Sequence, residues 1–303
     1  MNKLKTIAIV VTHNRINLLK RCLDNLQTQT LKVDKVLVID NGSSDGTQVF
    51  LDSIGVEYIR QPNLGSAGGW YTGLKYALRK RFDTAWLMDD DGYPHKDAYR
   101  LLKSAFKKNY ACISSVVINE RDHSKFVFPF PILNKNNLPK VGLKKTNINL
   151  VHELKVLSKD DLYPWAHLFN GALISINSVR HIGNVNRDYF LYGDETDFFF
   201  RLRKYGEVLS HTRALHFHPE ASKRPFNKIK IFYFLRNSII NYKKYYDLKI
   251  LRCSLGIFYL LFLVYKRNNL RTLFSLLIGR DKKYFYSSLH KGFFSKLGIN
   301  HEK

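Results

Sequence analysis

The sequence has few cysteines, few acidic residues and no long apolar run. Its 303 residues include three cysteines, at positions 22, 112 and 253, with no CxxC pair among them. This spacing indicates neither a disulfide framework nor a zinc site, and it is typical of a reducing cytoplasm. The longest apolar run, residues 253–265, is too short to cross a bilayer, which takes about 20 residues.

The apolar N-terminus is interpreted as a first strand and not as a secretory leader. Residues 6–12 are followed by His13-Asn14-Arg15, and no small-residue cleavage site intervenes. Together with the cysteine usage, this predicts a cytoplasmic protein.

Positive charge is abundant and unevenly placed. The chain has 49 lysines and arginines against 25 acidic residues, a formal net charge of +24. Residues 222–303 hold 18 of the basic residues and only three acids, so most of the excess lies there. A region this basic predicts contact with a polyanion, either nucleic acid or an anionic membrane face.

Beyond Pro225 the basic region has helical periodicity. Lys230, Arg236, Lys243 and Lys244 are expected off its apolar face. Apolar faces beside such charges favour a peripheral seat on the inner face of the cell membrane. The apolar face consists of Ile231, Phe234, Leu235, Ile239 and Tyr242.

Strand-like and helix-like segments alternate through the first part of the chain. Helices are expected over residues 18–26, behind an Asn17 cap, and over 68–78. Alternation of this kind predicts an α/β fold with a doubly wound, mostly parallel sheet. The expected strands are residues 6–12, 36–39, 56–59, 85–88, 111–117 and 172–176.

Two regions differ from this alternation. Residues 119–164 are rich in Pro, Asn and Lys without clear periodicity, and they are interpreted as a long excursion over the substrate face. The basic helical region follows the α/β part. We therefore predict a catalytic domain over residues 1–222 and a basic amphipathic helical domain over residues 223–303.

Acidic residues gather where two predicted strands end. Asp89-Asp90-Asp91 follows an apolar run, and Asp40-Asn41-Gly42-Ser43-Ser44-Asp45-Gly46 follows another. Ligands of open α/β sheets bind at the carboxyl ends of the strands. Three adjacent carboxylates repel one another unless a cation or a polar ligand lies among them. The pattern therefore indicates a ligand site.

A glycine-rich turn, Gly65-Ser66-Ala67-Gly68-Gly69, precedes the second predicted helix. Glycines let backbone N–H groups approach a phosphate at a helix N-terminus. The turn lacks the GxGxxG spacing, which argues against a nicotinamide dinucleotide.

The ordered motifs carry a family resemblance. Thr12-His13-Asn14-Arg15, the 40–46 turn, Asn63 to Trp70 and the acidic triplet together resemble the nucleotide-sugar domain of family 2 glycosyltransferases. These are inverting enzymes of the GT-A fold. The Asn-Leu-Gly-x-Ala-Gly-Gly block and Trp-x-Met-Asp-Asp-Asp are most similar to bacterial galactofuranosyltransferases. The resemblance covers roughly residues 5–220.

The resemblance implies a hexosyltransferase with a nucleotide-sugar site. Short polar groups after the first strand would reach the base and ribose, and the second strand tip would bind the uracil or ribose. The third block would bind the diphosphate, and the acidic triplet becomes a DxD motif. The implied donor-binding residues are Thr12, Asn14, Arg15, Asp40, Asn41, Asn63, Gly68, Gly69, Asp89 and Asp90.

The resemblance also implies a metal and a general base. Mn²⁺ or Mg²⁺ would be bound by Asp89, Asp91 and His218, because the departing nucleoside diphosphate builds negative charge. His216 is the alternative histidine. An acidic pair at a helix start carries the base; by position this is Glu195, and Asp194 remains an alternative because the usual order is reversed.

The implied donor is UDP-galactofuranose, with dTDP-rhamnose as the alternative, and the implied acceptor is a lipid-linked or growing cell-surface glycan. Two other classes compete with this one: a nucleic-acid-binding protein and a non-catalytic glycan-binding protein on a degenerate transferase fold. The basic excess lies mainly in the tail and the strand tips are acidic, so no nucleic-acid partner is expected. Homo-oligomerisation stays open.

Overall fold

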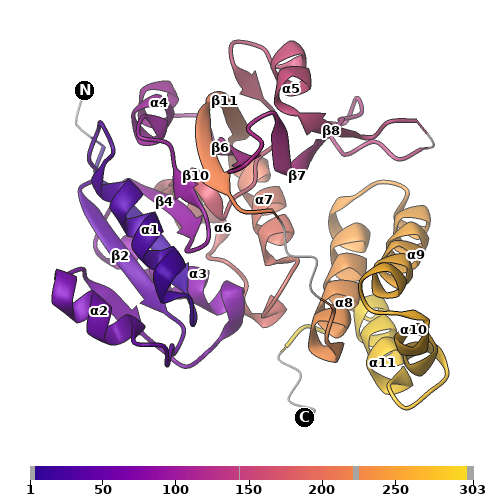
Figure 1. Cartoon of the computed structure of the whole chain (residues 1–303). Coiled ribbons are helices and arrows are strands. Elements are labelled where there is room, and N and C mark those ends of the chain that lie inside the picture. Colours follow the sequence, from indigo (N-terminus) through magenta and orange to yellow (C-terminus); the bar gives the residue numbers. More distant parts are fainter. Residues whose placement is uncertain (1–3, 143, 221–224, 299–303) are drawn as a thin grey trace. The chain divides into compact units, whose positions relative to one another are not determined.

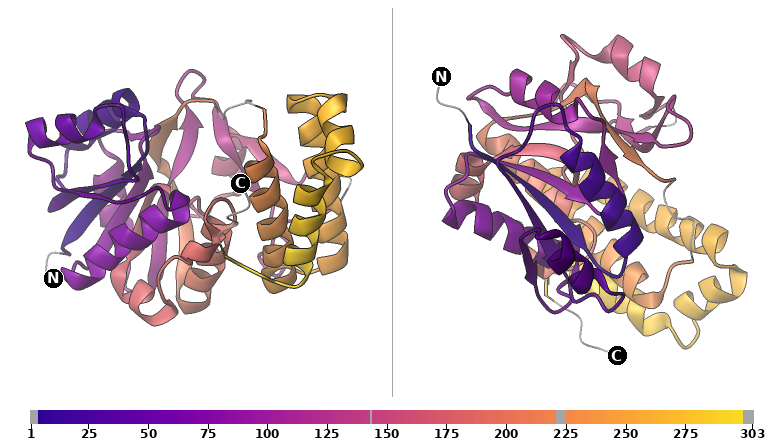
Figure 2. Two further views of the ribbon diagram at one scale, coloured as in Figure 1. Left: turned by 90° about the horizontal axis from the view of Figure 1, so that it is seen from below. Right: turned by 60° about the vertical axis from the view of Figure 1, so that its left-hand side comes forward.

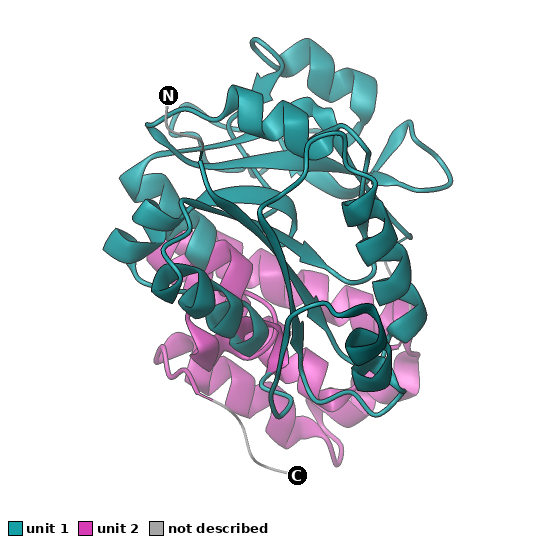
Figure 3. Cartoon of the chain, turned by 90° about the vertical axis from the view of Figure 1, so that its left-hand side faces the viewer, with its two compact units in different colours: residues 1–64, 68–185, 198–221 teal, residues 65–67, 186–197, 222–303 magenta. Residues whose placement is uncertain are grey.

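The computed structural model describes residues 4–142, 144–220 and 225–298 (Figure 1). The chain forms two compact units (Figure 3). Unit 1 comprises residues 1–64, 68–185 and 198–221, and unit 2 comprises residues 65–67, 186–197 and 222–303. Two short segments from the predicted catalytic part of the sequence thus belong to the same unit as the C-terminal helices.

The described residues of unit 1 form an 11-stranded sheet with the central order β3-β2-β1-β4-β10-β6-β11-β5. The first four of these strands are parallel: β1 (Thr6–Thr12), β2 (Lys35–Asp40), β3 (Tyr58–Arg60) and β4 (Thr84–Asp89). This agrees with the predicted α/β class. The remaining central strands are β10 (Asn170–Ser175), antiparallel to both its neighbours, β6 (Tyr110–Asn119), β11 (Glu207–His218), parallel to β6, and β5 (Tyr93–Pro94).

Helices cover both faces of this sheet (Figure 2). The side chains of β1 alternate between these two faces. Ala8 and Val10 pack with the apolar face of α1 (Ile16–Gln27). Ile9 lies on the other face, against Gly73 of α3 (Gly65–Arg79). The remaining helices with residues in unit 1 are α2 (Thr47–Ile54), α4 (Ala98–Ala105), α5 (Val151–Leu157), α6 (Ile176–Ile182) and α7 (Asp194–Tyr205).

The predicted cap of the first helix is wrong. Helix α1 begins at Ile16, so Asn17 lies inside its first turn. The Ile16 N–H group instead donates to Asp45 Oδ2, 2.9 Å away in the turn after β2. A cap supplied from a distant loop leaves no local sequence signal.

Residues 119–164 are more regular than expected. They contain β7 (Lys125–Pro131), β8 (Asn147–Leu150), α5 and β9 (Leu162–Tyr163). Each element is too short to show periodicity alone, but together they bury one apolar cluster. The buried members of this cluster include Val116, Phe126, Phe130, Ile148, Leu154 and Tyr163.

Unit 2 is largely helical and confirms the expected helices after Pro225. It contains α8 (Lys228–Tyr245), α9 (Lys249–Arg267), α10 (Leu270–Leu277), α11 (Lys282–Phe293) and a 3-10 turn, η1 (Arg187–Tyr189). Ile231, Leu235 and Ile239 of α8 are buried in its core. Arg236, which was expected off the apolar face, is 1% exposed. No helix among the described residues has the length and apolarity needed to cross a membrane.

Candidate active site

The tips of three parallel strands lie side by side. Thr12 at the end of β1 pairs with Asp40 at the end of β2, and Val11 pairs with Asp89 at the end of β4. The register therefore brings together the motifs after β1, β2 and β4, as the sequence predicted. These strands are buried, so the polar groups that follow them form the ligand-binding edge expected for such a sheet.

Arg15 supplies positive charge to the acidic triplet. Its Nη1 lies 3.0 Å from Asp90 Oδ1 and 2.5 Å from Asp91 Oδ2. Burial acts to lower the pKa of Arg15, but the charges of Asp90, Asp91 and Asp89 outweigh it and raise that pKa. The repulsion expected among the three carboxylates is thus partly neutralised by this guanidinium.

Asp90 is the buried member of the triplet. It is 1% exposed, and the Thr12 hydroxyl donates to its Oδ2 over 2.7 Å. Burial raises the pKa of Asp90 to about 6, although Arg15 and Thr12 both act to lower it. Thr12 and Asp90 are therefore bound to each other in a buried position at the edge of the site.

Asp91 is joined to His218, the last residue of β11. His218 Nε2 lies 3.1 Å from Asp91 Oδ1. The Pro219 carbonyl can only accept a hydrogen bond, so His218 Nδ1, 2.6 Å away, carries a proton and Nε2 faces the carboxylate. Burial opposes the shift, but His218 and Arg15 lower the pKa of Asp91, and Asp91 in turn raises the pKa of His218.

The two candidate histidines have different surroundings. Phe128 packs edge-on against His218, with ring centroids 5.3 Å apart. His216 is fully buried, and burial lowers its pKa to about 3. Of the two, His218 is the one that contacts the acidic triplet.

Asp91 and His218 are suited to a divalent cation. A carboxylate and a ring nitrogen whose partner nitrogen is anchored to a carbonyl are the expected ligand types and orientation. Within the described ranges no group of three or more His, Cys, Asp or Glu side chains is arranged so that it could hold a metal ion. The structure thus brings together two of the three predicted ligands, while the charge of Asp89 acts on Arg15.

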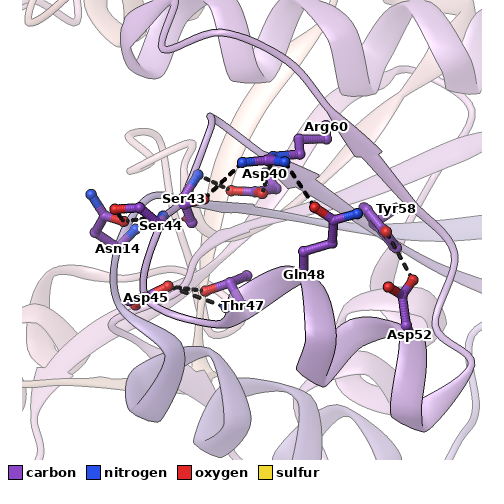
Figure 4. A network of polar contacts seen from close by, with 10 residues as sticks. All are labelled: Asn14, Asp40, Ser43, Ser44, Asp45, Thr47, Gln48, Asp52, Tyr58 and Arg60. Carbon is purple, nitrogen blue, oxygen red and sulfur yellow. Dashed lines mark hydrogen bonds and ion pairs between the residues drawn. The ribbon is translucent and has the colours of Figure 1, made fainter.

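The turn after β2 forms a dense polar network (Figure 4). Asp40 is fully buried, and its Oδ1 accepts the Ser43 N–H at 2.9 Å. Arg60 Nη2 donates to the Ser43 carbonyl at 3.0 Å, and its Nε lies 3.5 Å from Asp40 Oδ2. Asn14, which has a positive φ of 53°, accepts the Ser44 N–H at 2.7 Å. The network links the segments that follow β1 and β2.

The third donor block lies against the same edge. Gln61 donates to Asn41 Oδ1 over 2.7 Å. A Cβ on Gly69 would lie 2.6 Å from Val11 and 3.1 Å from the Asn41 amide, so only glycine fits there. Gly68 is buried in α3, whereas Asn63 is exposed.

The acidic pair begins α7, and this first turn of the helix belongs to unit 2. Asp194 is 4% exposed, and burial raises its pKa to about 6. Ser66 Oγ lies 3.4 Å from Asp194 Oδ2. Glu195 is half-buried. Asp197 in the same turn accepts hydrogen bonds from Tyr245 and Lys244 at 2.5 and 2.9 Å. In the first turn of α7, Asp197 is thus bound by side chains of α8, and Asp194 and Glu195 are the two candidates for the base.

Arg21 is a site residue that the sequence did not reveal. Its Nη2 donates to the Asp91 carbonyl and its Nη1 to Glu120, each over 2.7 Å, and its guanidinium lies 4.6 Å from the Tyr93 ring centroid. As one of 49 basic residues outside any motif, it carries no sequence signal.

Comparison with known proteins relates the chain to a family. Residues 7–155 match the model of the family "Glycosyl transferase family 2". Galactofuranosyltransferase GlfT1 of Mycobacterium tuberculosis is 34% identical over 208 residues, which cover 66% of this chain and 64% of that protein. GlfT1 of Mycolicibacterium smegmatis has the same identity, with 65% of its length covered. The chain thus spans less than two thirds of these relatives.

Solved structures of low sequence identity share the fold. A mannosyltransferase of Pyrobaculum calidifontis, solved with GDP-Man and Mn²⁺, has a TM-score of 0.55 at 15% identity, covering 96% of this chain and 88% of its own. S. aureus TarS has a TM-score of 0.56 at 13% identity, covering 94% and 79%. These likenesses confirm the predicted GT-A fold. Over residues 7–155 the chain matches glycosyltransferase family 2, and it is similar to galactofuranosyltransferases.

Proposed function

We propose that the protein is an inverting glycosyltransferase that moves a sugar from a nucleotide diphosphate to an acceptor hydroxyl. The observation that carries the proposal is the contact of His218 with Asp91 beside the aligned tips of β1, β2 and β4. The sequence similarity to galactofuranosyltransferases favours UDP-galactofuranose as the donor. A lipid-linked or growing cell-surface glycan is the proposed acceptor.

The proposed general base is Glu195. An acceptor hydroxyl is a weak acid, so a carboxylate must accept its proton as the bond to the sugar forms. Glu195 is half-buried and can meet an incoming hydroxyl, whereas Asp194 is buried beside Ser66. Attack from the face opposite the departing nucleotide inverts the anomeric carbon.

A divalent cation, Mn²⁺ or Mg²⁺, is proposed at Asp89, Asp91 and His218. When bound, it would neutralise charge on the departing diphosphate. Support comes from the paired Asp91 and His218 and from the Mn²⁺ named with the structurally similar mannosyltransferase. In the chain itself, Arg15 and Arg21 already bring positive charge to this edge.

We further propose that unit 2 docks peripherally on an anionic cytoplasmic membrane face. Helix α9 buries Cys253, Leu260 and Val264 but leaves other apolar side chains in solvent. Ile250 is 85% exposed and Phe258 68% exposed. The surrounding region carries 18 basic residues against three acids, and each basic group near anionic lipid contributes on the order of 1 kcal/mol.

A donor panel tests the transferase proposal. The full chain is incubated with Mn²⁺, a hydroxyl acceptor and either UDP-galactofuranose or dTDP-rhamnose, and the product's anomeric configuration is determined by NMR. We expect transfer from UDP-galactofuranose with inversion. Transfer from dTDP-rhamnose would replace the donor assignment, and no transfer from either donor would contradict the proposed activity.

A further inference from the structure

The segment that leads into α7 has an unusual backbone. Phe190 and Tyr192 have φ angles of 63° and 60°, and Gly193 has a φ of 78°. Bulky residues rarely adopt this left-handed region, because the side chain crowds the backbone. Such a conformation persists only where the surroundings hold it. Asp194 and Glu195 follow directly, so whatever holds this segment also fixes where the acidic pair begins.

Side chains of α8 bind the carbonyl groups of this segment. Asn237 Nδ2 lies 2.7 Å from the Tyr192 carbonyl, 2.9 Å from that of Leu191 and 3.1 Å from that of Tyr189. Arg236 Nη2 lies 3.1 Å from the Asp188 carbonyl oxygen. Both side chains are almost completely buried, at 1% exposure or less. In a dry environment these bonds strongly restrict the segment.

Asn241, one helical turn further along α8, binds the start of α7 itself. Its Nδ2 donates to the Gly193 carbonyl over 2.8 Å, and the same carbonyl accepts the Asp197 N–H at 3.0 Å. A Cβ on Gly193 would lie 2.8 Å from Asn237 Cβ and 3.0 Å from Asn241 Nδ2. The close fit of Gly193 against α8 therefore fixes the first turn of α7.

The same segment also contacts the glycine-rich turn within unit 2. A Cβ on Gly65 would lie 2.1 Å from the Phe190 carbonyl oxygen, and Gly65 has a φ of 72°. Ser66 Oγ lies 3.4 Å from Asp194. The turn assigned to the donor diphosphate and the acidic pair thus meet around a segment that α8 holds.

We propose that Arg236, Asn237 and Asn241 are positioning residues for the general base. They act through the 188–193 backbone, which sets the direction in which Glu195 leaves α7, and they make the C-terminal helices part of the catalytic apparatus. This inference rests on the proposed transferase function. It predicts that loosening these contacts slows the chemical step while donor binding is retained.

The test compares variants on two faces of α8. Asn241→Leu and Asn237→Leu remove the amide donors. Leu235→Ala, which lies in the apolar core of unit 2, is the stability control because it removes packing without removing a donor to the segment. Asn237→Gln offers a conservative variant that keeps an amide. For each, kcat, donor KM, the pH profile of kcat and hydrogen exchange of the Asp197 amide are measured below the melting transition.

We expect Asn241→Leu to lower kcat by about 10- to 100-fold, because small misplacement of a catalytic group has effects of this size. Donor KM should stay within about twofold, the acidic limb of the pH profile should shift, and Asp197 exchange should accelerate. Asn237→Gln should retain more activity than Asn237→Leu.

Equal kcat losses in Leu235→Ala and Asn241→Leu at matched stability would overturn the inference, as would unchanged Asp197 exchange in the Asn variants. An inactive wild-type chain would instead contradict the proposed function. In that case the exchange data alone decide whether α8 holds the segment.

Discussion

The two units use charge in opposite ways. At the strand edge of unit 1, a strongly basic chain places three acids together and partly neutralises them internally, with Arg15 2.5 Å from Asp91. Unit 2 is basic, yet Arg236, one of its buried charged residues, binds backbone carbonyls of the same unit. Net charge therefore does not indicate where the chemistry lies. The informative groups are the few ionic ones that the fold takes out of water.

Apolar exposure also distinguishes the two units. Among the described residues, 15 of 20 large exposed apolar side chains lie between residues 229 and 294. A soluble surface rarely gathers this many in one region unless something covers it. Unit 1 is thus organised around a polar edge, and unit 2 around an apolar and basic surface. The following predictions test this division.

The largest effect is expected at the base. Glu195→Gln should lower kcat by about 10²–10⁴-fold, because an amide cannot accept the hydroxyl proton. Donor binding, measured by calorimetry, should change little. If Asp194→Asn is the damaging change and Glu195→Gln is mild, the roles of the two acids are reversed.

The next effect is expected at the acidic edge of unit 1. Asp91→Asn should lower turnover by about 100-fold, since it removes charge beside both Arg15 and His218. The fold should survive, as judged by circular dichroism, because the substitution keeps the size of the side chain. Full activity in excess EDTA would exclude the metal role of this edge.

A smaller effect concerns stability and pH. The folded pKa of Asp194 is raised by burial to about 6 from a usual 3.8, so its stabilising neutral form is present at low pH and is lost as pH rises through about 6. The stability of wild type relative to Asp194→Asn should therefore fall between about pH 4 and 6, by on the order of 3 kcal/mol at about 1.4 kcal/mol per pKa unit. Urea unfolding across this range checks it. Parallel curves for both proteins would contradict the assignment.

The smallest effect concerns the surface of unit 2. Replacing Phe258 and Phe262 by Ser should weaken co-sedimentation with anionic vesicles by about tenfold, because two exposed rings no longer insert. Replacing the exposed Val49 and Ile54 of unit 1 by Ser is the matched control and should have no effect. Binding should also weaken with salt. Equal binding to zwitterionic vesicles would point to insertion without charge, and no binding to either would contradict membrane docking.

The sequence by itself determined the α/β class, the parallel strands and the order of the site motifs. Strand periodicity and turn chemistry are local, and parallel strands must end at one edge, so Thr12, Asp40 and Asp89 were predictable neighbours. The apolar face of α8 was predictable for the same reason.

Only the tertiary structure decided which distant groups meet. His218 contacts Asp91, Arg15 pairs with Asp90, and Arg236 is buried and binds the Asp188 carbonyl. Long-range pairing depends on strand register and on loop closure across many residues, and the local periodicity of the sequence does not predict either. Likewise, α9 has apolar residues on both its buried and its exposed sides, and only packing decides which of them are in the core.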